Sequence, residues 1–320
     1  MSKQAEKSYY ELEKPILQHK NKIEALQAGE TFDKEKIGSL RALIARDWEN
    51  LQPKLNALHL VQIARHPQRP YTLDYIDFLT DDFLEFHGDR RAGDDPAMVT
   101  GFGFYRGRSV VFIGHQKGRT TRERIERNFG QPVPEGYRKA LRIMKLAEKF
   151  GYPVVTLIDT QGAYPGIEAE ERGQAEAIAF NLKEIAQLRV PVVNLVIGEG
   201  GSGGALAVGV GDVLLMLENT FYSVISPEGC PAILWKDQGA VKQAAENLRF
   251  MAKDLKELGI VDTIIPEPPG GAHIDWELTF KNVDKQLNQT LKKLEEKPVD
   301  ERLEARYQKF RKIGVFAEDE

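Results

Sequence analysis

The chain has 320 residues, and its 44 lysines and arginines against 48 aspartates and glutamates give a formal net charge of −4. Hydrophobic residues make up 42% and charged residues 29%, which are ordinary proportions for a globular protein and exclude a wholly disordered chain. The balanced charge also excludes a strongly basic protein that binds nucleic acid non-specifically.

The single cysteine, Cys230, excludes an internal disulfide framework and any zinc site that needs several cysteines of this chain. No apolar run approaches the roughly 18 residues of a membrane-spanning helix. The first residues contain no apolar segment typical of a secretory signal. We therefore expect a cytoplasmic protein that holds no metal and contacts no membrane.

Residues 1–80 are charged and have a helical pattern. One apolar stripe recurs at spacings of three and four residues and consists of Ile37, Leu40, Ile44, Trp48, Leu51, Leu55 and Leu58. Pro53 lies inside the stripe and predicts a break or a new helix start. The stripe packs either on the chain's own core or on a partner subunit, and the spacing leaves both interpretations open.

Residues 81–270 contain the expected strands. Met98–Tyr105 and Arg108–His115 flank Arg106-Gly107 and predict a hairpin. Buried strands are predicted at Pro153–Asp159, Pro191–Ile197 and Val213–Leu217, with helical patterns at 137–147 and 175–185 between them. This alternation indicates an α/β core with crossover helices.

Residues 271–320 return to a charged helical pattern. Its apolar positions are Trp276, Phe280, Val283, Leu287, Leu291 and Leu294. As with the first stripe, this helix either packs on its own core or holds two chains together.

The densest chemical signal is the glycine cluster at 198–204, which follows a predicted strand. We expect a small-residue helix at Ala205–Val210 directly after it. Glycine lets the backbone approach a ligand closely, and free N–H groups at a helix start suit a phosphate or a transient oxyanion. A purely structural glycine turn is the plainer alternative.

The same cluster matches the dinucleotide-binding pattern G-x-G-x-x-G through Gly198, Gly200 and Gly203, with Glu218 about 20 residues further on. A nucleotide-binding oxidoreductase is therefore a second hypothesis. It is disfavoured because the following helix is short for a parallel crossover and because strands precede the motif.

A second unusual loop, 159–166, also follows a predicted strand, and we expect a helix from about Glu170. If the two strands are neighbours, the two loops line one crevice. The alternative is a Gly/Pro turn in which Asp159 caps its own backbone.

Several motifs occur together and in order. They are Ala64–Tyr71 (ARHPQRPY), Gly114–Arg119 (GHQKGR), Arg127–Gly130 (RNFG), Pro134–Ala140 (PEGYRKA), the 198–205 cluster and Ser226–Cys230 (SPEGC). This set resembles the carboxyltransferase alpha subunit of bacterial- and plastid-type acetyl-CoA carboxylase, over a domain of about 38–293. Gln161 departs from the family pattern, which usually has proline at this position of the loop.

The resemblance implies a crotonase-like (ClpP/crotonase) α/β fold, a spiral of ββα units with helical N- and C-terminal extensions. We accordingly divide the chain into a helical segment at 1–80, a carboxyltransferase core at 81–270 and a helical segment at 271–320. The implied reaction transfers a carboxyl group from carboxybiotin to acetyl-CoA and forms malonyl-CoA, the first committed step of fatty acid biosynthesis.

The resemblance also implies the partners. Biotin is carried on a separate biotin carboxyl carrier protein, the alpha subunit works with a beta subunit as α2β2, and biotin carboxylase belongs to the same complex, so ATP binding is expected only at the level of the complex. The beta subunit of the family holds the four-cysteine zinc site.

By this resemblance the N–H groups of Gly203 and Gly204 hold the biotin oxyanion. Further candidates for contact with carboxybiotin are Gly162, Ala163, Tyr164, Arg172, His115 and Lys117. Lys117 opens a basic run with Arg119, Arg122, Arg124 and Arg127 that either meets CoA phosphates or an acidic carrier, or is a solvated face. We expect a structural histidine at His115, a turn role for Glu228 and a buried Cys230.

Overall fold

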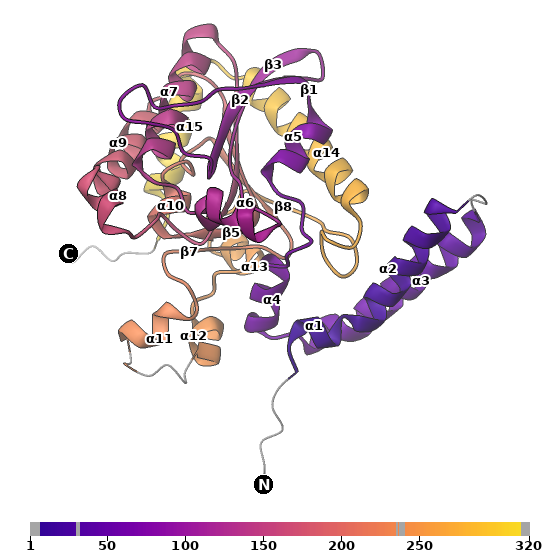
Figure 1. Cartoon of the computed structure of the whole chain (residues 1–320). Helices are drawn as coiled ribbons and strands as arrows, with labels where there is room; N and C mark the ends of the chain where they lie inside the picture. The colour runs from indigo at the N-terminus through magenta and orange to yellow at the C-terminus, as the bar shows by residue number, and fades with distance from the viewer. Residues whose placement is uncertain (1–6, 30–32, 235, 237–240, 315–320) are drawn as a thin grey trace, which may run out of the picture.

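The computed structural model describes residues 7–29, 33–234, 236 and 241–314, and its centre is an eight-stranded sheet (Figure 1). The strands are β1 Asp81–Glu85, β2 Met98–Tyr105, β3 Arg108–His115, β4 Val154–Thr160, β5 Val192–Gly201, β6 Val213–Leu217, β7 Phe221–Ser223 and β8 Thr263–Ile265. Their order is β1-β2-β3-β4-β5-β6-β8, with β7 paired to the end of β5. The first three strands are antiparallel, and the others pair in parallel.

The predicted hairpin is confirmed. Tyr105 pairs with Arg108 across a two-residue turn, and both turn residues are left-handed, with φ of 48° at Arg106 and 82° at Gly107. Turns of this kind match the right-handed twist of the flanking strands. The three predicted buried strands are also confirmed as β4, β5 and β6.

Helices cover both faces of the sheet. On one face α7 (Pro134–Phe150) and α9 (Gln174–Ala186) pack onto a core that includes Val111, Val154 and Val196. On the other face α5 (Thr72–Leu79) and α14 (Trp276–Glu295) bury Tyr75 and Phe280 against Val155 and Leu157. The last helix, α15 (Val299–Arg311), is attached to α9, because Arg306 donates to the carbonyl of Ile185 at 3.0 Å.

The N-terminal helices form an arm that projects from the sheet body (Figure 1). They are α1 (Tyr9–Leu12), α2 (Lys14–Ala28) and α3 (Lys34–Leu51), and α4 (Ala57–Ala64) returns to the body. The 37–58 stripe packs within the chain, because its first four members are buried in one cluster with Ile16, Ile23, Ile63 and Ile274. The helix breaks at Gln52–Lys54 (η1), as Pro53 predicts.

The 276–294 stripe likewise lies on the chain's own core, where Phe280, Val283, Leu287, Leu291 and Leu294 are buried. Short helices complete the fold. They are α6 (Thr121–Glu126), η2 (Asn128–Gly130), α8 (Ile167–Glu171), α10 (Ser202–Leu206), α11 (Gly229–Leu234), α12 (Val241–Asn247) and α13 (Ala252–Glu257). Within the described residues, no helix combines the length and hydropathy needed to cross a bilayer.

Candidate active site

The two glycine-containing loops lie against each other, as the sequence predicts. They lie at the carboxyl ends of β4 and β5, which are parallel neighbours. The glycine cluster does not simply follow its strand, because β5 continues beyond the predicted end at Ile197 and includes Gly198–Gly201. A Cβ atom at Gly201 would lie 2.1 Å from the Gln161 carbonyl oxygen, and one at Gly204 would lie 2.4 Å from the Ala163 nitrogen. Real side chains do not tolerate such distances, so glycine at both positions lets the two backbones meet.

The helix after the glycine cluster begins three residues earlier than predicted. The expected range is Ala205–Val210, but α10 runs from Ser202 to Leu206 and therefore includes Gly203 and Gly204. Glycine is a poor helix former, and the close packing against the neighbouring loop overrides this preference. Gly203 and Gly204 thus lie in the first turn, where amide N–H groups have no carbonyl of an earlier turn to bond.

An apolar cavity of about 380 Å³ lies beside this first turn. Gly203 and Ser202 line one side of it, and α13 and the segment before it line another. The lining residues are Ser202, Gly203, Leu206, Tyr222, Ser223, Val224, Leu248, Arg249, Phe250, Leu255, Leu258 and Ile260. Gly203 has space around it, since an added Cβ would meet only Ile178, at 3.5 Å.

A charge network lies beneath the two loops. The Lys117 ammonium contacts Asp159 Oδ1 at 2.7 Å and Glu199 Oε1 at 2.8 Å. Arg65 in turn donates to Glu199 at 2.7 Å and to Glu228 at 2.8 Å. The prediction that Lys117 belongs to a surface run is therefore wrong, because its ammonium forms ion pairs inside the protein, between the ends of β4 and β5.

The contacts of Asp159 differ from those of the alternative interpretation, a self-capped turn. Asp159 does not cap its own backbone, because its Oδ1 accepts the N–H of Glu199 on the neighbouring strand at 3.0 Å. Burial opposes the charge on Lys117, but the two carboxylates outweigh burial and hold the pKa of its ammonium above the usual value. Burial likewise opposes the charge on Glu199, yet Lys117 and Arg65 keep its pKa low. Lys117 and Glu199 are thus held in their charged forms.

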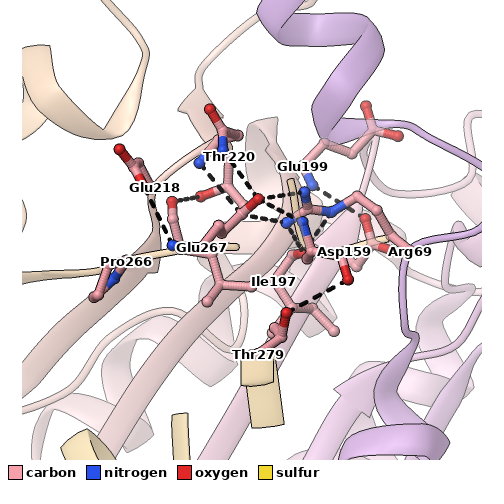
Figure 2. A network of polar contacts seen from close by, with 12 residues as sticks. Arg69, Asp159, Ile197, Glu199, Glu218, Thr220, Pro266, Glu267 and Thr279 are labelled. Atoms are coloured by element: carbon pink, nitrogen blue, oxygen red, sulfur yellow. Dashed lines mark hydrogen bonds and ion pairs between the residues drawn. The ribbon is translucent and has the colours of Figure 1, made fainter. Parts of the chain in front are cut away.

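A second buried ion pair supports β5 from the other side (Figure 2). Arg69 donates to Glu267 at 2.7 and 3.0 Å and to the carbonyl of Ile197 at 3.0 Å. Glu267 also accepts from Asn219 and from the Ala272 N–H. These bonds fix the strand directly before the glycine cluster.

Close packing accounts for two of the three glycines of the apparent dinucleotide motif. A Cβ at Gly198 would lie 2.3 Å from Asp159 Oδ1, and one at Gly200 would lie 2.2 Å from the Tyr222 ring. The carboxylate of Glu218 accepts the Glu267 N–H at 3.1 Å. With a five-residue α10 after it, the motif lacks the crossover helix of a dinucleotide fold.

His115 is fully buried at the end of β3, as a structural histidine would be. Its Nδ1 accepts the Asp159 N–H at 3.4 Å. Burial lowers the pKa of His115 to about 3, and the backbone of Gly204 opposes this only in part. The imidazole ring is therefore neutral. It lies beneath both loops, next to Asp159 of one and Gly204 of the other.

The remaining predicted residues lie around the loop after β4. Gly162 has a φ of 153°, and Ala163 and Tyr164 are half-buried. The Tyr164 hydroxyl donates to Glu168 at 3.1 Å, and a helix follows from Ile167, three residues before the predicted start. Arg172 is bound to Glu135 at 3.0 Å, so its Nε is held by a carboxylate of this chain.

The rest of the basic run is partly used for internal contacts. Arg119 pairs with Asp74 at 2.6 Å and lies over the rings of Tyr71 and Trp276, while Arg124 and Arg127 donate to the carbonyls of Gly118 and Pro96. Arg122 is exposed. Cys230 is buried, as predicted, and Glu228 pairs with Arg65.

Sequence reasoning misses the partners that assemble the network. Arg65 and Glu199 stand out only as members of longer motifs, because nothing in their spacing shows that they meet. It also misses a buried group of Glu13, His66 and His273, whose ligand atoms lie close enough to hold a metal ion. Gln68 N–H donates to His66 Nδ1 at 3.2 Å, so the ring proton lies on Nε2 and faces Glu13. Hydrogen bonds therefore account for this contact.

Comparison with known proteins identifies the family. A family model described as acetyl co-enzyme A carboxylase carboxyltransferase-like matches residues 9–314, wider than the domain expected from the sequence motifs. The acetyl-coenzyme A carboxylase carboxyl transferase subunit alpha of Shouchella clausii is 54% identical over 98% of both chains. The chain belongs to this alpha-subunit family. The subunit alpha of Geobacter metallireducens is 52% identical over 96% of this chain and 98% of its own.

Solved structures place the fold. This chain resembles transcarboxylase 12S with a TM-score of 0.59 and 20% identity, over 72% of this chain and 42% of the other. It resembles a Pseudomonas malonate decarboxylase hetero-tetramer with a TM-score of 0.57 and 17% identity, over 68% and 86%. The crotonase-like fold implied by the sequence resemblance is thereby confirmed, and the chain is a carboxyltransferase subunit.

Proposed function

We propose that this chain transfers the carboxyl group of carboxybiotin to acetyl-CoA and so forms malonyl-CoA for fatty acid biosynthesis. In this proposal it works in the cytoplasm as the alpha subunit of an α2β2 carboxyltransferase, with a biotin carboxyl carrier protein and biotin carboxylase as further partners. The family membership supports the reaction, and one structural observation supports the site: Gly203, which shares the first turn of α10 with Gly204, lines an apolar cavity.

The residues present fit a biotinyl group. Biotin combines an apolar bicyclic body with a polar ureido edge, and the cavity combines apolar walls with amides at one side. When bound, carboxybiotin supplies an activated carboxyl group whose release leaves negative charge on the ureido oxygen. Leu255, Leu258 and Ile260 would pack on the ring, and the Gly203 and Gly204 N–H groups would bind that oxygen.

The chain's contribution is thus electrostatic stabilisation by backbone donors that are fixed before the reaction. Loss of one such donor typically raises the barrier by about 2.7–4 kcal/mol. In this proposal Gly162, Ala163 and Tyr164 contact the biotinyl group from the loop that packs on Gly204, while His115 and Lys117 support both loops from beneath. Arg172 would act from beside this loop, held by Glu135.

The test is the reverse reaction, in which malonyl-CoA and biotin yield acetyl-CoA. It is run with this chain alone, with a beta subunit alone and with the mixture. We expect activity only in the mixture, since each subunit would supply one oxyanion site. Activity from this chain alone would contradict the division between subunits, and an assembled but inactive mixture would contradict the proposed reaction.

A further inference from the structure

Lys117 lies where four segments of the chain converge. It follows β3 by two residues, and its ammonium joins Asp159 at the end of β4 to Glu199 near the end of β5. Its stem passes Gly130 of η2, where an added Cβ would lie 2.7 Å from Lys117 Cγ. The side chain is 16% exposed, so its charge is largely removed from water.

The two carboxylates that Lys117 joins belong to the two glycine-containing segments, 159–166 and 198–204. Asp159 begins the loop 159–166, and Glu199 lies four residues before Gly203. A direct bond between the strands exists here, because Asp159 Oδ1 accepts the Glu199 N–H. Without the ammonium, two like charges would face each other at this junction and push the loops apart.

Stability alone does not account for such a group. Apolar residues of similar volume often replace a buried ion pair without loss of stability, so buried charges are better explained by a need for one defined geometry. We propose that Lys117 is a positioning residue that holds the Gly203 and Gly204 amides in place by clamping the ends of β4 and β5. This inference rests on the proposed function of those amides.

Other charged and titratable groups also face the junction and bear on its behaviour between pH 5 and 8. They are Arg65 after α4, Arg69 and Tyr71 before α5, His115 at the end of β3, and the exposed Glu228 paired with Arg65. The pKa values of Arg65, Arg69 and Tyr71 are raised and that of His115 is lowered, which keeps all four outside this range.

The first test measures the reverse reaction of the assembled complex with Lys117→Met. We expect kcat to fall about 10²-fold, the scale of a misplacement of about 1 Å, with little change in the KM for malonyl-CoA. The rate should also fall as pH rises from 5 to 8, because one of the two facing carboxylates then loses its proton and repulsion begins. Unchanged kcat and an unchanged pH profile would overturn the proposal.

A second variant separates the clamp from the cost of an unpaired charge. In Lys117→Met with Asp159→Asn, the amide oxygen still accepts the Glu199 N–H and Glu199 keeps Arg65, so no carboxylate is left unpaired. We expect a complex of normal stability and no pH-dependent fall, but a kcat that stays low. Recovery of the wild-type kcat would show that Lys117 only balances charge and would overturn the positioning role. This variant carries the test if the single variant does not fold.

Lys309→Met is the matched control, since Lys309 has the same exposed fraction of 16% and is also paired with a carboxylate, Asp262. It lies at the opposite end of the parallel strands, where its ammonium also donates to the carbonyl of Asp212 before β6. Its kcat and pH profile should match wild type. Wild-type activity in the mixture tests the proposed function separately, so a complex that is active while Lys117→Met behaves as wild type contradicts only the positioning role.

Discussion

The backbone of Gly204 lies directly against the backbone of Gly162, so that a Cβ at Gly204 would be 2.4 Å from the Gly162 carbonyl carbon. This contact joins a helix turn after β5 to a loop after β4. Because no side chain separates the two segments, the backbone of α10 packs directly on the backbone of the loop 159–166. The contrast with the adjacent Gly203, which has open space, gives the first prediction.

Gly203→Val should leave the fold and the assembly intact, because its Cβ would meet only Ile178 at 3.5 Å. Turnover should fall by about 10²-fold or more, as for loss of an oxyanion donor, since the branched side chain crowds the amide that would bind the oxyanion. Activity and assembly mass are measured on the same complex. Wild-type turnover in an assembled complex would contradict the role assigned to this turn.

Gly204→Ala should behave differently from Gly203→Val. The added methyl group overlaps the Gly162–Ala163 backbone, so the loops must separate, and we expect a loss of about 1–3 kcal/mol in stability together with lower turnover. Urea unfolding of both variants under one set of conditions measures the difference. Equal stabilities would show that the backbones of Gly204 and Gly162 can separate without loss of stability.

Gly198→Ala and Gly38→Ala form a pair with opposite expected signs. A Cβ at Gly198 would lie 2.3 Å from Asp159 Oδ1, so the substitution should destabilise by about 1–3 kcal/mol. Gly38 is exposed inside α3 with no atom within 4 Å of an added Cβ, so alanine there should stabilise by roughly 0.5–1 kcal/mol. Thermal or urea unfolding measures both changes in stability. A stabilising effect of Gly198→Ala would contradict the close approach of Gly198 to Asp159.

Arg69→Met should destabilise strongly, by about 3–5 kcal/mol, because it leaves the buried carboxylate of Glu267 without its cation. Arg69→Met with Glu267→Gln should recover part of this loss, since an amide oxygen in the place of Oε2 still accepts from Asn219 Nδ2 and from the Ala272 N–H. Arg189→Met, which breaks an exposed pair with Asp300, is the control and should change stability little. Additive effects of the two buried changes would contradict a coupled pair.

Acidification should weaken the attachment of the N-terminal arm. Burial lowers the pKa of His273 to about 4, so unfolding takes up a proton, and stability is lost as pH falls from about 6.5 towards 4. Despite burial, the two histidines lower the pKa of Glu13 to about 2, so its contribution is present above its ordinary pKa and is lost as pH falls from about 4.5.

The measurement compares unfolding free energies at pH 7 and pH 5. His273→Gln should show a smaller decrease than wild type, because it removes the group that takes up the proton. His87→Gln changes an exposed histidine, and its unfolding free energy should decrease by as much as that of wild type. A decrease of equal size in all three proteins would place the pH dependence elsewhere.

Much of the fold could be predicted because its signals are local. The β2–β3 hairpin follows from two apolar runs separated by Arg106-Gly107, and the buried strands follow from short apolar segments. The helix start at Ser202 could not be predicted in this way. The three glycines around it are weak helix formers, and the packing of Gly201 on Gln161 and of Gly204 on Gly162 selects the helical turn.

The family, the strands and the position of the glycine cluster follow from the sequence alone, because motifs and apolar periodicity are properties of neighbouring residues. The role of Lys117 follows only from the folded chain. Its sequence neighbours, Arg119 to Arg127, suggest a basic surface, but its actual partners, Asp159 and Glu199, are 42 and 82 residues away. Their charges interact strongly only where the parallel strands bring them together out of water. No local sequence pattern indicates that these residues are in contact.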